Sequence, residues 1–251
     1  MNLRNSTKRV LRVAALGLVV LLAQGCATGP NANPADPLEP FNRSVFNFNE
    51  GVDRAIFKPV ATAYRDVTPS PVRTGVSNFF GNISDVWSVV NNVLQLKPKE
   101  ALETGMRVAF NTVFGFAGVL DIGTEMRLQR NKQDFGQTLG HWGVESGAYV
   151  VLPFFGPSSV RDTVGSLVDA NADLVNRTDR VGVRNSLATL RVVDTRARFL
   201  DAGDALEQAS LDEYSFTRDL YLQRRSNSIG KAPAVAEERY DLPAPTAPAA
   251  K

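Results

Sequence analysis

Apolar residues recur at helical spacing along most of the middle of this chain. Between positions 41 and 56 they step by four, three, four and four residues, which places them on one face of a helix: Phe41, Val45, Phe48, Val52 and Ile56. The opposite face carries Asn42, Asn49 and Asp53. Proline cannot continue the hydrogen-bonding pattern of a helix interior, so Pro59 is expected to end this element.

A longer apolar stripe covers positions 71–97: Val72, Val76, Phe79, Ile83, Val86, Val90, Val93 and Leu96, widened by Phe80, Trp87 and Leu94. Arg73 and Asp85 are the only charges before Lys97, so this face is expected to need a large apolar partner. A looser helical step follows from 183 to 200, and Ser210 with Glu213 forms a capping box before a helix through Tyr221. Sustained alternation of period two is missing, so the pattern predicts an all-α fold.

Two uncharged segments depart from the pattern of a soluble helix bundle. One is 13 residues long, at 108–120, and contains Phe110, Phe114 and Phe116. The other, of 15 residues at 146–160, is broken by Pro153 and Pro157. Both are too short to cross a bilayer, which takes about 20 residues. They are either buried core or helices lying within a membrane, with breaks where the backbone faces protein or water.

The N-terminus has the pattern of an export signal, with a basic stretch followed by 11 uncharged apolar residues at 13–23. The sequence Leu22-Ala23-Gln24-Gly25-Cys26 resembles a lipobox, in which cleavage precedes a lipid-modified cysteine. The alternatives are an ordinary cleaved signal or a buried free thiol. Cys26 is the only cysteine and lies at the expected position, so it is predicted to be the lipid attachment site. Ala27, in place of an aspartate, favours the outer membrane.

Composition divides the rest of the chain into three parts. A proline-rich tether is expected at 26–40, a helical domain at 41–225 and a disordered Pro/Ala-rich tail at 226–251. Cleavage of the signal peptide, 1–25, removes four basic residues, so the 28 basic residues fall to 24 against 26 acidic ones. Without a basic excess, the mature chain has no electrostatic signature of a nucleic-acid-binding protein.

Candidate catalytic chemistry is sparse. With one histidine, His141, and one cysteine, the chain cannot build a multi-histidine or multi-cysteine metal site. A triad of His141 with a serine and Asp121, Asp134 or Asp162 stays open, although residues this common carry little weight. His141 is expected to pack or to form hydrogen bonds. We predict no enzymatic activity, metal or cofactor.

Several motifs, in order, resemble the MlaA (VacJ) lipoproteins. The first are Asp36-Pro37-Leu38-Glu39-Pro40-Phe41-Asn42-Arg43, Phe46-Asn47-Phe48-Asn49, Lys58-Pro59-Val60-Ala61, Tyr64-Arg65-Asp66 and Ser77-Asn78-Phe79. The next are Asn111-Thr112-Val113-Phe114-Gly115, the specific stretch Asp134-Phe135-Gly136-Gln137-Thr138-Leu139-Gly140-His141-Trp142-Gly143-Val144, and Leu152-Pro153-Phe154-Phe155-Gly156-Pro157. Together they span roughly 36–170, and little is recognisable between 174 and 199.

This resemblance implies a fold and a function that the residues alone do not give. It implies a ring of mostly amphipathic helices in the inner leaflet of the outer membrane, on the periplasmic side, around a central channel. It also implies removal of mislocalised phospholipids from the outer leaflet to a periplasmic carrier of the MlaC type, which maintains lipid asymmetry, with trimeric porins as partners. The alternative is a structural or porin-associated lipoprotein without transport activity.

Two segments are singled out as candidate sites. Phe114, Gly115, Phe116 and Gly118, with Asp121 and Gly123, are expected to form a hairpin in the channel wall, because glycines permit the bend or movement of a gate. An equally supported alternative is close helix packing relieved by glycine. Phe46, Asn47, Phe48 and Asn49 are expected to lie on the first helix and to support the ring, because Phe48 shares the apolar stripe.

Overall fold

The computed structural model describes residues 36–230. The signal peptide, Cys26, the tether up to position 35 and the tail from 231 lie outside the described residues, so the predictions made for them stay predictions. The described part begins five residues before the predicted start of the helical domain, and its last helix extends three residues beyond the predicted end at 225.

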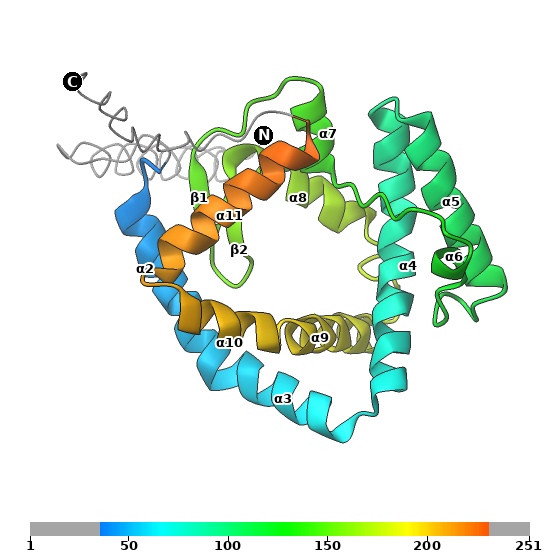
Figure 1. Cartoon of the computed structure of the whole chain (residues 1–251), viewed down its shortest axis with the longest axis horizontal. Coiled ribbons are helices and arrows are strands. Elements are labelled where there is room, and N and C mark those ends of the chain that lie inside the picture. The colour runs from blue at the N-terminus through cyan, green and yellow to red at the C-terminus, as the bar shows by residue number, and fades with distance from the viewer. Residues whose placement is uncertain (1–35, 231–251) are drawn as a thin grey trace, which may run out of the picture.

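The first helical run is longer than the sequence predicts. Helix α2 (Glu39–Val52) passes through a π-helical turn, η1 (Asp53–Phe57), into α3 (Lys58–Val67), along the left and lower sides of Figure 1. The prediction that Pro59 ends the helix is therefore wrong. The backbone N–H of Lys58 bonds the carbonyl of Asp53, five residues back. This wider turn leaves room for the proline ring, and Pro59 lies in the first turn of α3, where its missing N–H is tolerated.

The apolar stripe at 71–97 forms α4 (Ser70–Leu94), which is joined by a short loop to α5 (Pro98–Val113). These two helices pack side by side, and the one-turn helix α6 (Ile122–Glu125) lies against α5 (Figure 1). The helix predicted for this stripe therefore exists, with ends within three residues of the predicted ones.

The uncharged segment 146–160 is a β-hairpin and not a helix within a membrane. After α7 (Phe135–His141), strand β1 (Tyr149–Leu152) pairs antiparallel with β2 (Gly156–Ser159), which leads directly into α8 (Val160–Ala172). Tyr149 lies opposite Ser159 and Leu152 opposite Gly156. The connecting loop needs left-handed backbone at Phe154 and Gly156, a conformation that glycine adopts without strain. The strands are too short to show sustained alternation in the sequence.

The last three helices are α9 (Val181–Arg198), α10 (Leu200–Ala209) and α11 (Glu213–Ser228). The predicted capping box is wrong in its N-cap: Asp212, not Ser210, accepts hydrogen bonds from the backbone N–H groups of Tyr214 and Ser215. The helix also continues beyond Tyr221 to Ser228. With one small hairpin as the exception among the described residues, the prediction of a mostly helical fold is confirmed.

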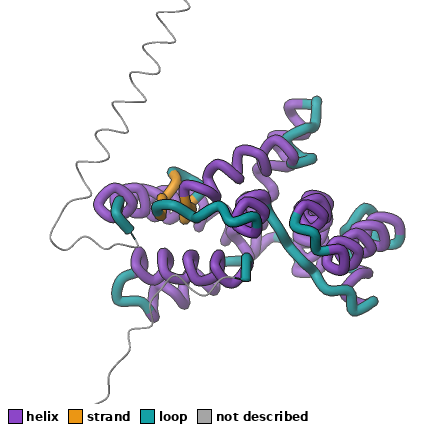
Figure 2. Tube along the Cα trace, turned by 90° about the horizontal axis from the view of Figure 1, so that it is seen from above, coloured by secondary structure: helices purple, strands orange, loops and turns teal. Residues whose placement is uncertain are grey.

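The elements follow one another around a ring in Figure 1, with α2 and α3 on the left and below, α4 on the right, and α7, α8 and α11 above. Helix α9 contacts both α3 and α4, although it begins 87 residues after the end of α4. The perpendicular view of Figure 2 shows the two strands flanked by helices toward one end of the molecule. No helix within 36–230 is both long and apolar enough to cross a membrane.

Burial in this structure is inverted relative to a water-soluble helical protein. The residues of α4 that are buried include Asn82, Asp85, Ser88, Asn91 and Asn92. Its apolar stripe is partly exposed, as at Val72, Val86, Val90 and Val93. The first helix repeats this, because Asn42 is its buried residue while Phe41, Phe48 and Ile56 are half exposed. The expected large apolar protein partner is therefore missing from the described chain, and the polar faces hold the helices together.

Candidate functional site

Helix α2 holds the β-hairpin through two asparagines that lie two helical turns apart. The fully buried Asn42 donates to the carbonyl of Tyr149 at 3.0 Å and accepts from the N–H of Val151 at 2.9 Å. Asn49 donates to the carbonyl of Leu152 at 3.0 Å and accepts from the N–H of Phe154 at 2.8 Å. Each amide side chain thus satisfies a donor and an acceptor of the hairpin, so the register between α2 and β1 is fixed.

The other residues of the predicted ring-supporting segment contact different parts of the chain. The ring of Phe46 packs edge to face on Tyr214 of α11 at 5.6 Å, and Phe48 packs in the same way on Phe154 at 5.4 Å. Asn47 is exposed. The structure therefore brings Phe46, Phe48 and Asn49 to the junction of α2, the hairpin and α11, while a role for Asn47 stays a prediction.

This junction borders a cavity of about 790 Å³. It is bounded by the end of α2 and η1, by the hairpin loop, and by α9, α10 and α11. Most of its lining is apolar, and its aromatic members are Phe57, Phe154, Phe155, Phe199 and Phe216. The volume falls in the range of about 300–1,000 Å³ that is usual for small-molecule sites. The cavity therefore has the size and apolar character to receive part of a lipid.

Four charged side chains also belong to this lining. Arg196 of α9 forms a two-bonded ion pair with Asp53 of η1, both at 2.7 Å, and these hydrogen bonds raise the pKa of Arg196. Glu50 also lines the cavity, and burial, together with the nearby charge of Glu213, raises the pKa of its carboxyl group. Arg224 adds a cation from α11. The cavity is thus amphipathic, because a mostly apolar lining includes charged side chains.

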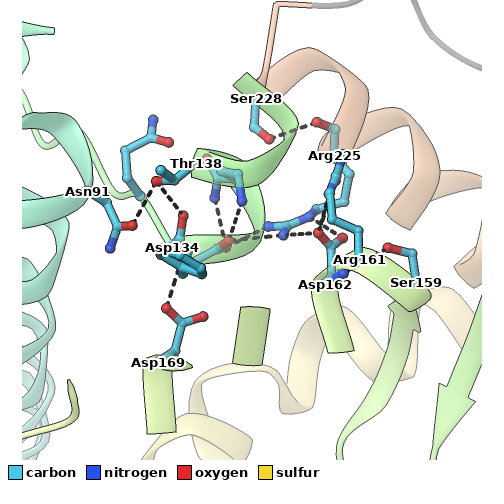
Figure 3. A network of polar contacts seen from close by, with 12 residues as sticks. Asn91, Asp134, Thr138, Ser159, Arg161, Asp162, Asp169, Arg225 and Ser228 are labelled. Carbon is cyan, nitrogen blue, oxygen red and sulfur yellow. Dashed lines mark hydrogen bonds and ion pairs between the residues drawn. The ribbon is translucent and has the colours of Figure 1, made fainter. Parts of the chain in front are cut away.

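A buried polar network fastens α11 to α7 and α8 (Figure 3). Arg225 of α11 donates to Asp134, the N-cap of α7, at 2.5 and 3.0 Å, and to Asp162 of α8 at 2.8 Å. Asp162 also accepts from Arg161 at 2.9 Å and from the hydroxyl of Tyr221 at 2.6 Å. One guanidinium therefore links three helices that are far apart in the sequence.

Electrostatics in this network favour the charged carboxylates. Burial opposes ionisation of Asp162, but hydrogen bonds from Arg225 and Tyr221 outweigh it and hold its pKa at about 2. Burial likewise opposes ionisation of Asp134, and the bonds from Arg225 still lower its pKa. Asp134 and Asp162 therefore stay ionised and bind Arg225, and these three residues form a structural clasp between the helices.

The predicted channel hairpin at 114–123 is a tight turn between α5 and α6. Phe116, Ala117 and Gly118 have left-handed backbone, and Asp121 caps α6 by accepting from the N–H of Thr124. A Cβ on Gly118 would lie 2.5 Å from Asn82 of α4. In Figure 1, α5 and α6 lie on the side of α4 away from α9. The contacts of this turn agree with close packing relieved by glycine, and its role as a gate stays a prediction.

The other three members of this segment also make packing contacts. Phe114 stacks on Phe110 at 5.8 Å. Gly123 lies beside Arg107, and its N–H donates to Asn111 at 2.8 Å. A Cβ on Gly115 would come within 2.3 Å of the backbone oxygen of Leu120, so only glycine fits there.

The carboxylates considered for a triad with His141 are bound elsewhere. Asp121 accepts two hydrogen bonds from Arg107 at 2.8 and 2.9 Å, and Asp134 and Asp162 are held by Arg225. His141 is exposed, and its ring packs edge to face on Trp142 at 5.5 Å, in agreement with the packing role predicted for it. Among residues 36–230, no group of three or more His, Cys, Asp or Glu side chains is placed to hold a metal ion.

Sequence reasoning missed the residues that fasten distant elements. The sequence gives no partner for Arg225, and it places Asn42 only on the polar face of its helix. The spacing of seven between Asn42 and Asn49 is a signal that was present, because it places two amide side chains on one face of the helix. No local signal pairs Arg225 with Asp134, since these residues are 91 positions apart.

Comparison with known proteins agrees with this geometry. The family model of the MlaA lipoproteins matches residues 34–228. The intermembrane phospholipid transport system lipoprotein MlaA of Escherichia coli K12 is 40% identical over 221 residues, covering 85% of this chain and 87% of that protein. The protein of the same name from Haemophilus influenzae is 32% identical over 247 residues, covering 94% and 96%.

A solved structure gives the same picture for the fold. It concerns the structural basis for maintenance of bacterial outer membrane lipid asymmetry, and it aligns with a TM-score of 0.68 at 35% sequence identity. The alignment covers 77% of this chain and 98% of that one.

Proposed function

This chain belongs to the MlaA lipoprotein family, and from that premise we propose that it carries phospholipid in an intermembrane transport system of the outer membrane. In this proposal it takes mislocalised phospholipid from the outer leaflet and passes it to a soluble periplasmic carrier of the MlaC type. Lipid asymmetry is thereby maintained. The amphipathic cavity of about 790 Å³ is the observation that carries the proposal.

The physical requirement is that acyl chains and head group find different surroundings along one path. Acyl chains gain free energy from apolar walls, at about 25 cal/mol per Å² of apolar surface removed from water. A charged head group that lost its water without polar partners would raise the barrier by several kcal/mol. A lining that combines aromatic side chains with Arg196, Asp53 and Arg224 meets both requirements.

Exposed apolar side chains support a position within one leaflet. The exposed apolar side chains of α4 include Val72 and Val93, and α2 adds Phe41 and Phe48. We propose that these face lipid acyl chains of the inner leaflet, with Cys26 as a lipid anchor and trimeric porins as neighbours. In this arrangement the buried polar faces lie toward the protein, where the amide groups of Asn82 and Asn92 donate hydrogen bonds to other parts of the chain.

The position in the membrane has its own test. The mature protein with Cys26→Ala, reconstituted directly into bilayers, should stay bound in about 1 M salt, at which interactions between surface charges are screened beyond about 3 Å. Release of this variant by salt would show that the anchor alone holds the protein, and the embedded position would be wrong.

The transport activity is tested in bilayers that contain the mature protein and its carrier, by measuring ATP-independent movement of labelled phospholipid. Ala205→Trp should slow this movement, because Ala205 lines the cavity and an indole would occupy it. Gln208→Trp, an exposed position on α10 outside the lining, is the matched control. A porin-associated or structural lipoprotein would move no lipid, and a lipid hydrolase would leave fatty acid or lysolipid.

A role of the 114–123 turn as a gate is proposed separately. Its glycines and left-handed residues support it, and a cross-link between α4 and this turn tests it. Cysteines at Asn78 and Val119, where the amide of Asn78 reaches the carbonyl of Val119 at 3.1 Å, would join the two. Undiminished lipid transfer in the oxidised protein would exclude the gate.

A further inference from the structure

A second pocket lies where the first turn of α4 meets the last turns of α9. Its volume is about 330 Å³, and it is lined by two arginines, Arg73 and Arg198, together with hydroxyl-bearing side chains: Ser70, Thr74 and Ser77. Asp194 is the only carboxylate in the lining. Two guanidinium groups against one carboxylate leave the pocket with a net positive charge, so its chemistry suits an anion.

Arg73 is the part of this pocket that the fold does not explain. Within the described chain its side chain makes no ion pair and no hydrogen bond, and its Nε is buried without a partner. Buried donors in folded proteins are nearly always paired, so a missing acceptor points to a ligand. The arginines that fasten the fold differ in this respect: Arg196 is held by Asp53, and Arg225 by Asp134 and Asp162.

Asp194, the carboxylate in this lining, does not neutralise Arg73. Asp194 is almost fully buried and accepts hydrogen bonds from Tyr64 at 3.3 Å and from Ser77 at 3.0 Å. Arg198 approaches the same carboxylate at 3.4 Å. Three partners therefore share the oxygens of Asp194. The first turn of α4 contains no acidic residue, so the positive end of this 25-residue helix adds to the potential.

The positive charge of this pocket does not extend along α9. Arg184, Arg191 and Arg198 recur every seven residues, which places them on one face of the helix, but Arg191 is paired with Asp173 at 2.5 Å. The neighbouring pocket of about 190 Å³ that Arg191 lines contains three carboxylates, Asp134, Asp169 and Asp173. The net positive charge is therefore confined to the pocket that holds Arg73 and Arg198.

We propose that the Arg73–Arg198 pocket binds the phosphate group of a phospholipid head. This rests on the proposed function and adds the position of the head group. A phosphodiester has one negative charge and acceptor oxygens that fit two guanidinium groups and the adjacent hydroxyls. Free phosphate offers the same chemistry, so the test must separate the two sources.

The test uses the mature protein in detergent micelles and titration calorimetry with dihexanoyl phosphatidylglycerol. Arg73→Gln should weaken binding about tenfold or more, as expected for loss of a charge-assisted hydrogen bond. Arg73→Lys should recover part of it. Arg180→Gln is the matched control, because Arg180 is an exposed arginine without an ion pair that precedes the same helix. It should stay within about twofold of the parent, and dihexanoylglycerol, which lacks phosphate, should not distinguish the variants.

Several outcomes would overturn the proposal. Equal affinity of Arg73→Gln and the parent for phosphatidylglycerol would remove the site. If inorganic phosphate bound tightly and Arg73→Gln abolished that binding without changing lipid affinity, the pocket would serve free phosphate. Should Arg73→Gln fail to fold, as judged by circular dichroism, Arg198→Gln makes the same comparison. If the parent transfers phospholipid and both variants bind it with the affinity of the parent, this site alone is refuted. If the parent transfers no phospholipid, the proposed function is refuted.

Discussion

Replacement of Arg225 tests whether one buried guanidinium holds the ring of helices closed. The side chain is 16% exposed and binds two carboxylates, of which Asp162 is 6% exposed and Asp134 is 36% exposed. Arg225→Gln would leave Asp134 without an ion-pair partner among the described residues and the buried Asp162 with Arg161 as its remaining cation. Breaking a buried ion pair in this way costs about 3–5 kcal/mol. A domain of this size loses about 2–4 °C of melting temperature per kcal/mol, so a fall of about 6–20 °C is expected.

The assay is thermal unfolding of the mature protein in detergent, followed by circular dichroism. Arg224→Gln is the control, since Arg224 is the neighbouring exposed arginine and makes no ion pair among the described residues. It should melt within about 2 °C of the parent, because surface charges contribute little. The double variant Arg225→Gln with Asp134→Asn should recover part of the loss, because the carboxylate left without a cation is then removed. An Arg225→Gln protein that melts like the control would show that the clasp is not what fastens α11.

Acid titration examines the same clasp without a substitution. The folded-state pKa of Asp162 is about 2, below the usual value for aspartate, so its stabilisation is complete above about pH 4 and is lost as the pH falls toward 2. The shift corresponds to about 2 kcal/mol. The parent should lose this much more stability over that range than the Asp162→Asn variant, and parallel curves for the two proteins would contradict the assignment.

Other contacts make equally specific predictions. Asn49→Ala removes two hydrogen bonds to the hairpin, so amide exchange at 149–159 should rise by about tenfold or more, while Asn47→Ala, at an exposed neighbour, should leave it unchanged. Gly115→Ala should destabilise the protein by about 2 kcal/mol or more, because its Cβ would lie 2.3 Å from the Leu120 oxygen. Gly105→Ala, a helical glycine with open space around its Cβ, should stabilise it by about 0.5–1 kcal/mol, and equal effects of the two changes in chemical denaturation would refute the packing of the turn.

The sequence predicts the helices well where the stripe is long, as for α4, because spacing depends only on the helix period. It does not predict which face is buried. In water the stripe of Val86, Val90 and Val93 would point inward, yet the structure buries Asn91 and Asn92 from the opposite face. Amphipathic spacing shows that a helix has an apolar and a polar face. It does not show which of the two is buried, because that depends on the surrounding solvent. The uncharged segments 108–120 and 146–160 suggested an apolar environment, but they did not show which helices would face it.

Errors of element type have local physical causes. Pro59 was read as a helix end because the rule assumes α-helical geometry, whereas a π turn places the proline in a new first turn. The hairpin was missed because Tyr149-Val150-Val151-Leu152 is uniformly apolar, so it shows no alternation. Short length, β-branched residues and the flanking Pro153 and Gly156 are signals that favour a strand pair there.

Polar contacts carry the specificity of this fold because apolar contacts cannot. If the exposed valines and phenylalanines face acyl chains, then separating two helices exchanges contacts between apolar side chains for contacts with acyl chains. The free energy of the helices therefore changes little. A buried asparagine or aspartate that loses its partner in such surroundings has no water to replace it, so the penalty is large. This explains why Asn42, Asn49 and Arg225 each join segments more than 90 residues apart, and why the two apolar clusters of the described chain are so small. The same reasoning distinguishes structural arginines from a ligand-binding one. Arg196 and Arg225 are paired with carboxylates and stabilise the fold, whereas the buried Nε of Arg73 has no acceptor among the described residues and is available to a ligand.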